Sequence, residues 1–328
     1  MLILGTRGSE LALRQAEMVA TALQAALPEL RVEREIISTV GDRRPDLRFR
    51  EFTDGPHLDK GIFTKELETA LAAGEIDAAV HSLKDVPTEI ADTFCIAATL
   101  PRAPIEDVLV SRDGFTWQTL PAGAKIGTSS VRRIRQLQWL RPDVTCVEIR
   151  GNVPTRVKKL IAPSDLDGVL LARAGLERLG LLGGTGLQPV CATGILPVVI
   201  DAFTLHASIL PCAEFLPAAG QGAIGIEARQ NDSRTLAALR AINHAETFAR
   251  VTAEREFLHL LKAGCQTPIG AHTWIEGQTL HMKVLVFDEA ASGAPPFAAE
   301  DSGPLSNPRS VAAALARRVL NHQPVPTS

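Results

Sequence analysis

A polar cluster at positions 81–87 (His-Ser-Leu-Lys-Asp-Val-Pro) follows a short apolar run, Ile76 to Val80. The run predicts a buried strand, and Pro87, which has no backbone N–H, indicates that regular pairing stops near Lys84 and Asp85. In open α/β sheets, ligands bind beyond the carboxyl ends of the strands. An Asp beside a Lys at such an edge can stay ionised and stabilise a positively charged intermediate. A solvated turn with an incidental ion pair is the alternative.

Three other segments place hydroxyl or guanidinium groups where a predicted strand meets a predicted helix. They are Thr6-Arg7-Gly8-Ser9, Gly127-Thr128-Ser129-Ser130-Val131-Arg132-Arg133, and Arg150-Gly151-Asn152 together with Arg156. Helix N-termini offer unbonded N–H groups, and arginine adds a planar fork suited to carboxylates. Any one of these sites has helix capping as its alternative. Three of them indicate a ligand with several carboxylates or phosphates. No GxxxxGK[ST] or GxGxxG motif occurs at these three junctions, which argues against a nucleotide there.

A single cysteine on a predicted turn is the remaining reactive candidate. Gly264 can end the preceding helix and Pro268 prevents its continuation, so Cys265 lies on the turn between them. An exposed thiol can act as a nucleophile or a covalent anchor, whereas a lone cysteine is more often a small buried apolar residue. The histidines His81, His206 and His244 lack metal-ligand spacing, so we expect no metal site.

The composition is that of a globular protein with local positive sites. The chain has 328 residues, 45% of them hydrophobic, and a net charge of −3, which gives no reason to expect a nucleic-acid partner. Five irregularly spaced cysteines form no disulfide or metal pattern. The N-terminus lacks the features of a signal peptide, and the most apolar stretch, Ile195 to Leu210, is interrupted by Pro197 and Asp201. We therefore expect a cytoplasmic protein with no membrane partner.

The pattern of apolar residues predicts two α/β halves followed by an α+β segment. The first half alternates strand and helix, which implies a mainly parallel sheet, and its predicted elements are Met1–Gly5, Leu11–Leu27 with Ser9 as N-cap, Val32–Ser38, Lys65–Ala73 and Ile76–Val80. The second half repeats the pattern at Lys125–Ile126, Val131–Leu140, Thr145–Ile149, a helix from Pro154, and Leu166–Ala172. The last segment contains a helix from Glu246 to Lys262, a hairpin around Gly277, a loop at Ala290–Pro308 and a helix at Ser310–Leu320.

These motifs together resemble the porphobilinogen deaminase (hydroxymethylbilane synthase) family. The resemblance covers nearly the whole chain in the right order, and it rests on Thr6–Ser9, Lys60-Gly61-Ile62-Phe63, His81–Pro87, Gly127–Arg133, Arg150-Gly151-Asn152-Val153, Leu216–Gly222 and Gly264–Gly270. It implies two α/β domains like those of periplasmic binding proteins, with the active cleft between them, and a smaller third α+β domain. The expected boundaries are 1–100 plus 222–241, 105–217, and 245–328.

The resemblance also implies the chemistry and the roles of the residues. A dipyrromethane, joined by a thioether to Cys265, is extended by four porphobilinogen molecules with loss of ammonia, and water then releases the linear tetrapyrrole hydroxymethylbilane. Asp85, with Lys84, matches the catalytic position, where a carboxylate stabilises the cationic azafulvene that forms as ammonia leaves. The residues matched to cofactor binding are Arg7, Ser9, Ser82, Lys84, Thr128, Ser129, Ser130, Arg132, Arg133 and Arg150. Those matched to substrate binding are Arg7, Arg150, Arg156, Gln221, Lys60 and Phe63. A monomer is expected on the same ground.

Three features depart from the family pattern. The loop before Lys60 reads Leu58-Asp59 where the family usually has a pair of glycines, which bears on the flexibility of that loop. Arg173 stands where a small or apolar residue is usual, and it either enters the cleft or points to solvent. The segment at about 182–215 is roughly twenty residues longer than the family's connection, and a short repeat inside it suggests a loosely structured inserted loop.

Two other functions explain part of the pattern. A two-lobed anion receptor without catalysis explains the duplicated halves and the anion sites, but it gives no role to Asp85 or Cys265. An enzyme inactivated by the insertion is less favoured, because every required motif residue is present.

Overall fold

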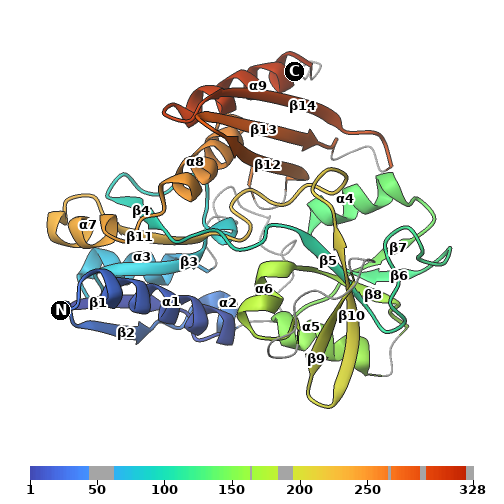
Figure 1. Cartoon of the computed structure of the whole chain (residues 1–328), viewed down its shortest axis with the longest axis horizontal. Coiled ribbons are helices and arrows are strands. Elements are labelled where there is room, and N and C mark those ends of the chain that lie inside the picture. The colour runs from blue at the N-terminus through green and yellow to red at the C-terminus, as the bar shows by residue number, and fades with distance from the viewer. Residues whose placement is uncertain (44–62, 163–164, 184–194, 265–266, 289–292, 323–328) are drawn as a thin grey trace. The chain divides into compact units, whose positions relative to one another are not determined.

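The computed structural model describes residues 1–43, 63–162, 165–183, 195–264, 267–288 and 293–322 (Figure 1). The chain divides into two compact units, Met1–Ala103 with Gly220–Thr252 and Pro104–Ala219 with Ala253–Ser328. The described residues form one sheet in the first unit and two in the second.

The first unit is built on a mainly parallel sheet. Its strand order is β2 (Val32–Ile36), β1 (Leu2–Thr6), β3 (Ala78–Ser82), β11 (Ile224–Arg229) and β4 (Phe94–Thr99). β1 pairs in parallel with both β2 and β3, whereas β11 runs antiparallel to β3 and β4. β1 and β3 run in the same direction, so their carboxyl ends lie on the same side of the sheet. Arg7, which follows β1, and the turn at Lys84, which follows β3, therefore leave the sheet on that side.

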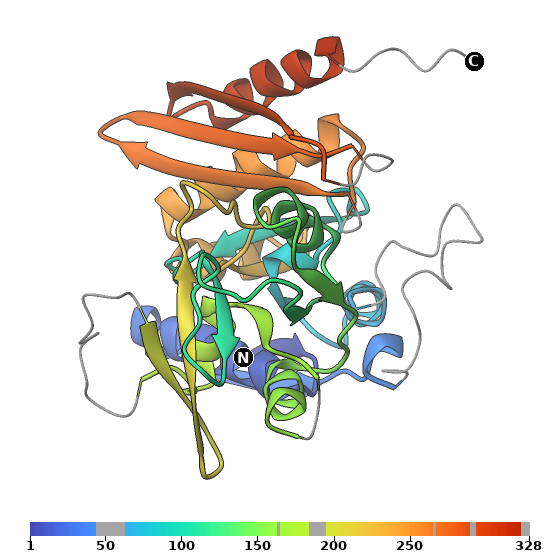
Figure 2. The ribbon, with the colours of Figure 1, turned by 90° about the vertical axis from the view of Figure 1, so that its right-hand side faces the viewer.

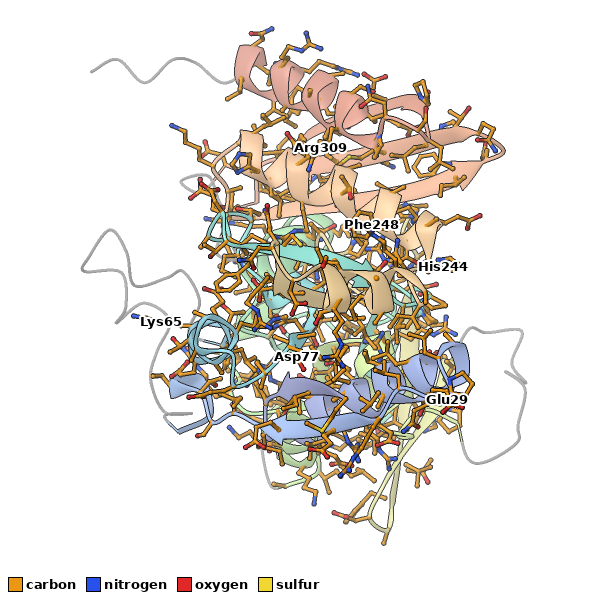
Figure 3. All side chains as sticks on the ribbon, turned by 90° about the vertical axis from the view of Figure 1, so that its left-hand side faces the viewer. Glu29, Lys65, Asp77, His244, Phe248 and Arg309 are labelled. Atoms are coloured by element: carbon orange, nitrogen blue, oxygen red, sulfur yellow. The ribbon has the colours of Figure 1, made fainter. Side chains whose placement is uncertain are left out.

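Helices α1 (Glu10–Ala26), α3 (Lys65–Ala73) and α7 (Ser233–Arg240) pack on this sheet, and α2 (Val40–Arg43) is one short turn. The predicted N-cap of α1 is confirmed, since the Ser9 hydroxyl accepts a hydrogen bond from the Ala12 N–H at 3.3 Å. Figure 3 labels Lys65, where α3 begins, and Asp77, where the chain enters β3. The Asp77 carboxylate accepts from the Ile3 N–H at 2.8 Å and so joins the start of β3 to β1.

The second unit repeats this topology in another sheet. The order there is β7 (Thr145–Val147), β6 (Lys125–Gly127), β8 (Gly168–Ala172), β5 (Asp107–Ser111), β10 (Phe203–Leu210) and β9 (Ile195–Ile200). The central β6 is parallel to β7 and β8, and β5 runs antiparallel to β8, as β11 does to β3 in the first sheet. Helices α4 (Val131–Leu140), α5 (Val153–Ile161) and α6 (Arg173–Arg178) complete the unit's α/β part.

A smaller α+β part ends the chain. The antiparallel strands β12 (Ile269–Glu276), β13 (Thr279–Val286) and β14 (Phe297–Pro304) pack against α9 (Pro308–His322), which lies along the sheet in Figure 2. Buried residues of α8 (Ala245–Leu260) join the same core. Arg309 of α9, labelled in Figure 3, forms an ion pair with Glu256 of α8 at 3.3 Å. The two α/β sheets of matching topology and this smaller part confirm the expected fold class.

Several predicted boundaries are wrong. The strands expected at Val32–Ser38, Thr145–Ile149 and Leu166–Ala172 cover Val32–Ile36, Thr145–Val147 and Gly168–Ala172. The expected loop at 290–308 contains β14, which pairs with β13 along its whole length; this pairing outweighs the low strand propensity of a segment rich in Ala, Asp, Ser and Gly. The strand expected at Ile76 begins at Ala78 and runs to Ser82. Ile76 is fully buried but lies before the strand, so its hydrophobicity signals burial and not pairing.

The interpretation of residues 182–215 as a loosely structured loop is also wrong for its described part. β10 pairs with β5, and β9 adds the sixth strand, with Val198 and Ile200 buried. The outer edge of β9 is covered as well, because Gly183 and Val199 donate backbone hydrogen bonds to Pro197 and Leu181. Residues 184–194 lie outside the described part of the chain.

Candidate active site

Lys84 and Asp85 lie on a single 3-10 turn, η2 (Leu83–Asp85), directly after β3. The turn is held on both sides, because Leu83 (1% exposed) and Val86 (4% exposed) are buried and the Leu83 N–H bonds to the Ala223 carbonyl at 3.1 Å. Lys84 is half-buried, and Asp85 is exposed. Within the described part of the chain, no hydrogen bond or ion pair occupies the Asp85 carboxylate. A rigid backbone therefore presents an exposed acidic group.

A second turn packs directly on the backbone of η2. Gly220 adopts a φ of 72°, and a Cβ there would lie 3.1 Å from the Lys84 nitrogen, so only glycine fits without strain. Gln221, expected to be a polar group near the ligand, is 1% exposed, and its carbonyl accepts from the Arg102 Nε at 2.9 Å. Gln221 is thus buried next to Gly220, the residue that packs on η2.

The other predicted residues at this edge fall into two groups. Arg7 is half-buried, and its guanidinium lies 4.0 Å from the centre of the Phe63 ring, so these two predicted ligand residues are brought together. The hydroxyls of Ser9 and Ser82 have structural partners: Ser9 caps α1, and Ser82 exchanges hydrogen bonds with the Gln15 amide at 2.8 and 3.1 Å. Gln15 is 2% exposed, so this pair fixes α1 to the end of β3.

In the second unit, the hydroxyl residues before α4 build a rigid turn. Thr128 is buried, and its Oγ1 accepts from the Ser130 N–H at 3.3 Å. The Ser129 hydroxyl donates to the Ile149 carbonyl at 2.6 Å and accepts from the Ile149 N–H at 3.2 Å. Ser130 is the N-cap residue of α4, but its side chain makes no capping bond. Of the three hydroxyls, that of Ser130 is the one best suited to a ligand.

Arg132 and Arg133 are buried and share one carboxylate. Asp107 on β5 is fully buried and accepts from Arg132 Nη1 at 2.7 Å and from Arg133 Nη2 at 2.6 Å and Nε at 3.0 Å. Burial by itself raises the pKa of Asp107, yet the two guanidinium groups outweigh it and hold that pKa below its ordinary value. Burial lowers the pKa of Arg132, and the charge of Asp107 opposes that shift. Arg133 also donates to the Leu170 carbonyl at 3.0 Å, so its fork is directed into the protein.

Arg150 and Arg156 are more accessible. The Arg150 Nε donates to Glu148 at 2.7 Å, but Glu148 is exposed, and such a surface pair contributes little and can be exchanged for a ligand carboxylate. The Arg156 Nε donates to the Gly151 carbonyl at 2.7 Å. Arg173 forms ion pairs with Glu106 at 3.5 Å and Glu177 at 2.7 Å, both within its own unit.

Two family models match the chain. The model described as porphobilinogen deaminase, dipyromethane cofactor binding domain, matches residues 2–237, and the model of the C-terminal domain matches 248–321. The chain belongs to the porphobilinogen deaminase family.

Similar proteins agree with this assignment. The porphobilinogen deaminase of Syntrophomonas wolfei is 44% identical over 86% of this chain and 84% of its own, and that of Desulforudis audaxviator is 41% identical over 97% and 94%. Among solved structures, a substrate-binding domain of a putative amino acid ABC transporter from Streptococcus pneumoniae is similar over 80% of this chain and 98% of its own, at 12% identity and a TM-score of 0.41. The activity is that of the family, a transferase that condenses porphobilinogen into hydroxymethylbilane with a dipyrromethane cofactor.

The described residues fit a cofactor that carries several carboxylates. Four half-buried residues are cationic: Arg7, Lys84 and Arg150 follow β1, β3 and β7, and Arg156 lies on α5. Their partly exposed heads suit acetate and propionate groups, which bind guanidinium in a bidentate manner. Arg133 fits less well than the sequence pattern indicated, because its Nε and both terminal nitrogens already bond to Asp107 and Leu170.

Two predicted residues, Lys60 and Cys265, lie outside the described residues. The residues that flank Cys265 are held together, since Gly264 donates to the Thr267 hydroxyl and Thr267 donates to the Gly264 carbonyl, both at 3.1 Å.

The sequence interpretation missed two buried polar residues. Asp107 directly precedes the apolar run Val108–Val110 and begins β5, and Gln15 stands among Ala12, Ala16 and Val19 on the buried face of α1. A polar residue at an apolar position of a strand or helix is the signal that could have found both, because such a group needs an internal partner.

Proposed function

We propose that Asp85 is the carboxylate that stabilises the positive charge arising on the substrate as ammonia departs, with Lys84 beside it. The observation that carries this proposal is that Asp85 is exposed, on a turn fixed by Leu83 and Val86, with no partner within the described part of the chain. A fixed carboxylate that needs no rearrangement stabilises developing charge more strongly than solvent does.

The cofactor carboxylates are held by Arg7, Ser130, Arg132 and Arg150, and those of the substrate by Arg7, Arg150 and Arg156. The partial exposure of Arg7, Arg150 and Arg156 supports these roles. Thr128, Ser129 and Arg133 shape the turn and helix that carry them, through bonds to Ser130, Ile149 and Asp107. Ser9, Ser82 and Gln221 shape the elements around Asp85 in the first unit. Phe63 and Lys60 cover the bound ligand. When bound, the dipyrromethane supplies the pyrrole to which porphobilinogen is joined.

Cys265 is the attachment point of the cofactor. It follows Gly264 and α8, within the residues that the family's C-terminal domain model matches. Peptide mapping of the purified chain is expected to find the adduct on Cys265. An adduct on Cys95, Cys146, Cys191 or Cys212 would overturn the assignment.

The chain acts as a monomer of three domains, 1–100 plus 222–241, 105–217 and 245–328, in the cytoplasm, without a nucleic-acid or membrane partner. Three separate sheets, each with its own core, support the division. Among the described residues, Cys95 and Cys146 are not joined in a disulfide, which suits a reducing compartment. None of the described helices combines the length and apolar character that a membrane span requires.

Replacement of Asp85 tests the proposed role. Asp85→Glu keeps the charge but moves it by one methylene, whereas Asp85→Asn keeps the size and removes the charge, so the Glu variant should release ammonia from porphobilinogen faster than the Asn variant. The opposite order would mean that Asp85 acts through its shape. If the parent protein binds porphobilinogen without releasing ammonia, the alternative function, an anion receptor without catalysis, would be favoured.

A further inference from the structure

Gln136 of α4 is fully buried and forms a reciprocal pair with one backbone residue. Its Nε2 donates to the Leu216 carbonyl at 2.9 Å, and its Oε1 accepts from the Leu216 N–H at 2.7 Å. Arg132 Nη1 donates to the same carbonyl at 2.5 Å. The backbone N–H of Leu216 is a donor and its carbonyl is an acceptor. The Gln136 amide must therefore turn its oxygen to the N–H and its nitrogen to the carbonyl. One turn of α4 therefore binds both polar backbone groups of Leu216.

The opposite side of Leu216 packs against the C-terminal sheet. A Cβ at Gly270 would lie 2.7 Å from the Leu216 Cβ, so glycine is needed for this close approach. The next residue along, Ala271, donates its N–H to the Pro217 carbonyl at 2.9 Å. Leu216 thus stands between α4 and the beginning of β12, in contact with both.

An apolar contact reinforces the same junction. Leu216 packs with Leu285 and Phe287, and the Trp139 ring of α4 meets Phe287 edge-on with 6.1 Å between ring centres. The Phe287 N–H bonds to the Pro268 carbonyl at 3.2 Å. Pro268 precedes β12, so this contact also fixes the approach to that strand.

We propose that Gln136 is a positioning residue for cofactor capture: it fixes Leu216, and through Leu216 it sets the place of β12 relative to Arg132. The proposal rests on the proposed function, in which Arg132 binds the cofactor and Cys265, four residues before β12, anchors it. The cofactor is bound covalently at one end and by charged groups at the other, so it is captured efficiently only when these two attachment points are correctly spaced. A misplacement of about 1 Å is enough to slow the reaction strongly.

The test compares Gln136→Met with the parent as full-length chains. Methionine keeps the length and apolar packing but offers Leu216 neither donor nor acceptor. Incubation of the cofactor-free chain with porphobilinogen, followed by intact mass measurement, is expected to show adduct formation on the order of tenfold slower, while turnover per loaded molecule stays within about twofold. Amide hydrogen exchange of Leu216 and Ala271 should be faster by a similar factor even without cofactor.

Two control variants and one further test variant separate positioning from general stability. Gln118→Met changes an exposed glutamine of the same unit and should load as the parent does. Leu160→Ala opens a cavity beneath α5, away from Leu216, so it should lower the Tm without slowing loading of the folded chain. Gly270→Ala pushes Leu216 from the other side and should slow loading as Gln136→Met does.

Normal loading and normal exchange at Leu216 in Gln136→Met would overturn the proposal, as would an equal loss of loading in Leu160→Ala at a matched Tm. Failure of the proposed function gives a different result: the parent itself would then carry no adduct, or would carry it on a cysteine other than Cys265.

Discussion

Asp85 and Asp107 are aspartates near the ends of strands in two sheets of the same topology, but their surroundings are opposite. Asp85 is exposed on η2, with no partner within the described part of the chain. Asp107 is fully buried between Arg132 and Arg133, which hold its pKa below the usual value against the effect of burial.

The difference separates a carboxylate available for chemistry from one that holds the structure. The carboxylate of Asp107 is fully buried, and Arg132 and Arg133 compensate its charge before any ligand arrives. An exposed carboxylate on a rigid turn has no such compensation and can respond to charge on a substrate. The two aspartates should therefore fail differently when they are replaced.

The largest expected effect is on stability at Asp107. Asp107→Ala leaves two buried guanidinium groups without their shared carboxylate, which should lower the free energy of unfolding by about 3–5 kcal/mol. Chemical denaturation measures this loss. Asp85→Ala, the matched control, should change it by less than about 0.5 kcal/mol, since the side chain is exposed. Equal losses of unfolding free energy in the two variants would contradict the proposed difference between a structural Asp107 and an exposed Asp85.

A second large effect is expected from β9. Deletion of residues 184–200 removes the edge strand and with it the buried Val198 and Ile200, so the second unit should lose several kcal/mol of stability, on the scale of about 1.5–3 kcal/mol for each buried side chain. Deletion of 184–194 alone is the matched control and should leave the Tm nearly unchanged. A normal Tm after the longer deletion would show that β9 does not support the sheet.

A smaller effect on ligand binding is expected at Arg150. Arg150→Leu removes a charge-assisted contact worth about 1.5–3 kcal/mol and should raise the KM for porphobilinogen or impair cofactor assembly, with a normal Tm. Arg150→Lys should rescue only in part, because the bidentate fork is lost. Arg133→Leu should show the reverse pattern, with a lowered Tm, since its partners are Asp107 and Leu170. Normal kinetics in Arg150→Leu would place Arg150 outside the site.

The smallest expected effect is on acid stability. The pKa of Asp107 is lower in the folded chain than its usual value of about 3.9, so its contribution is present above that pH and is lost as the pH falls through the folded-state pKa. Below about pH 4, the free energy of unfolding should therefore fall less steeply with decreasing pH for Asp107→Asn than for the parent. Chemical denaturation at a series of pH values measures this slope. Identical slopes would mean that Asp107 does not titrate with unfolding.

The sequence predicted the elements that local patterns determine. α3 and α4 have the predicted bounds, and the N-cap Ser9 and the turn after β3 lie where expected. β9 and β14 were missed although each pairs with its neighbour in the sequence, β10 and β13, because Pro197 interrupts β9 and the residues of β14 have low strand propensity. Sequence distance limited the prediction for Arg133: its position on α4 was predictable, but Asp107, which directs it inward, comes from a strand 26 residues away.

The most direct test is single-turnover ammonia release by Asp85→Asn and Asp107→Asn, each expressed per molecule that carries the cofactor. Loss of a preorganised charge predicts that Asp85→Asn is slower by on the order of 100- to 1,000-fold while remaining as stable as the parent. For Asp107→Asn, the rate per molecule that carries the cofactor should stay within a few-fold of the parent's rate. The defect of this variant should be a lower stability and a smaller fraction of molecules loaded with cofactor. Release by Asp85→Asn within a few-fold of the parent would contradict the assignment of Asp85 as the catalytic carboxylate.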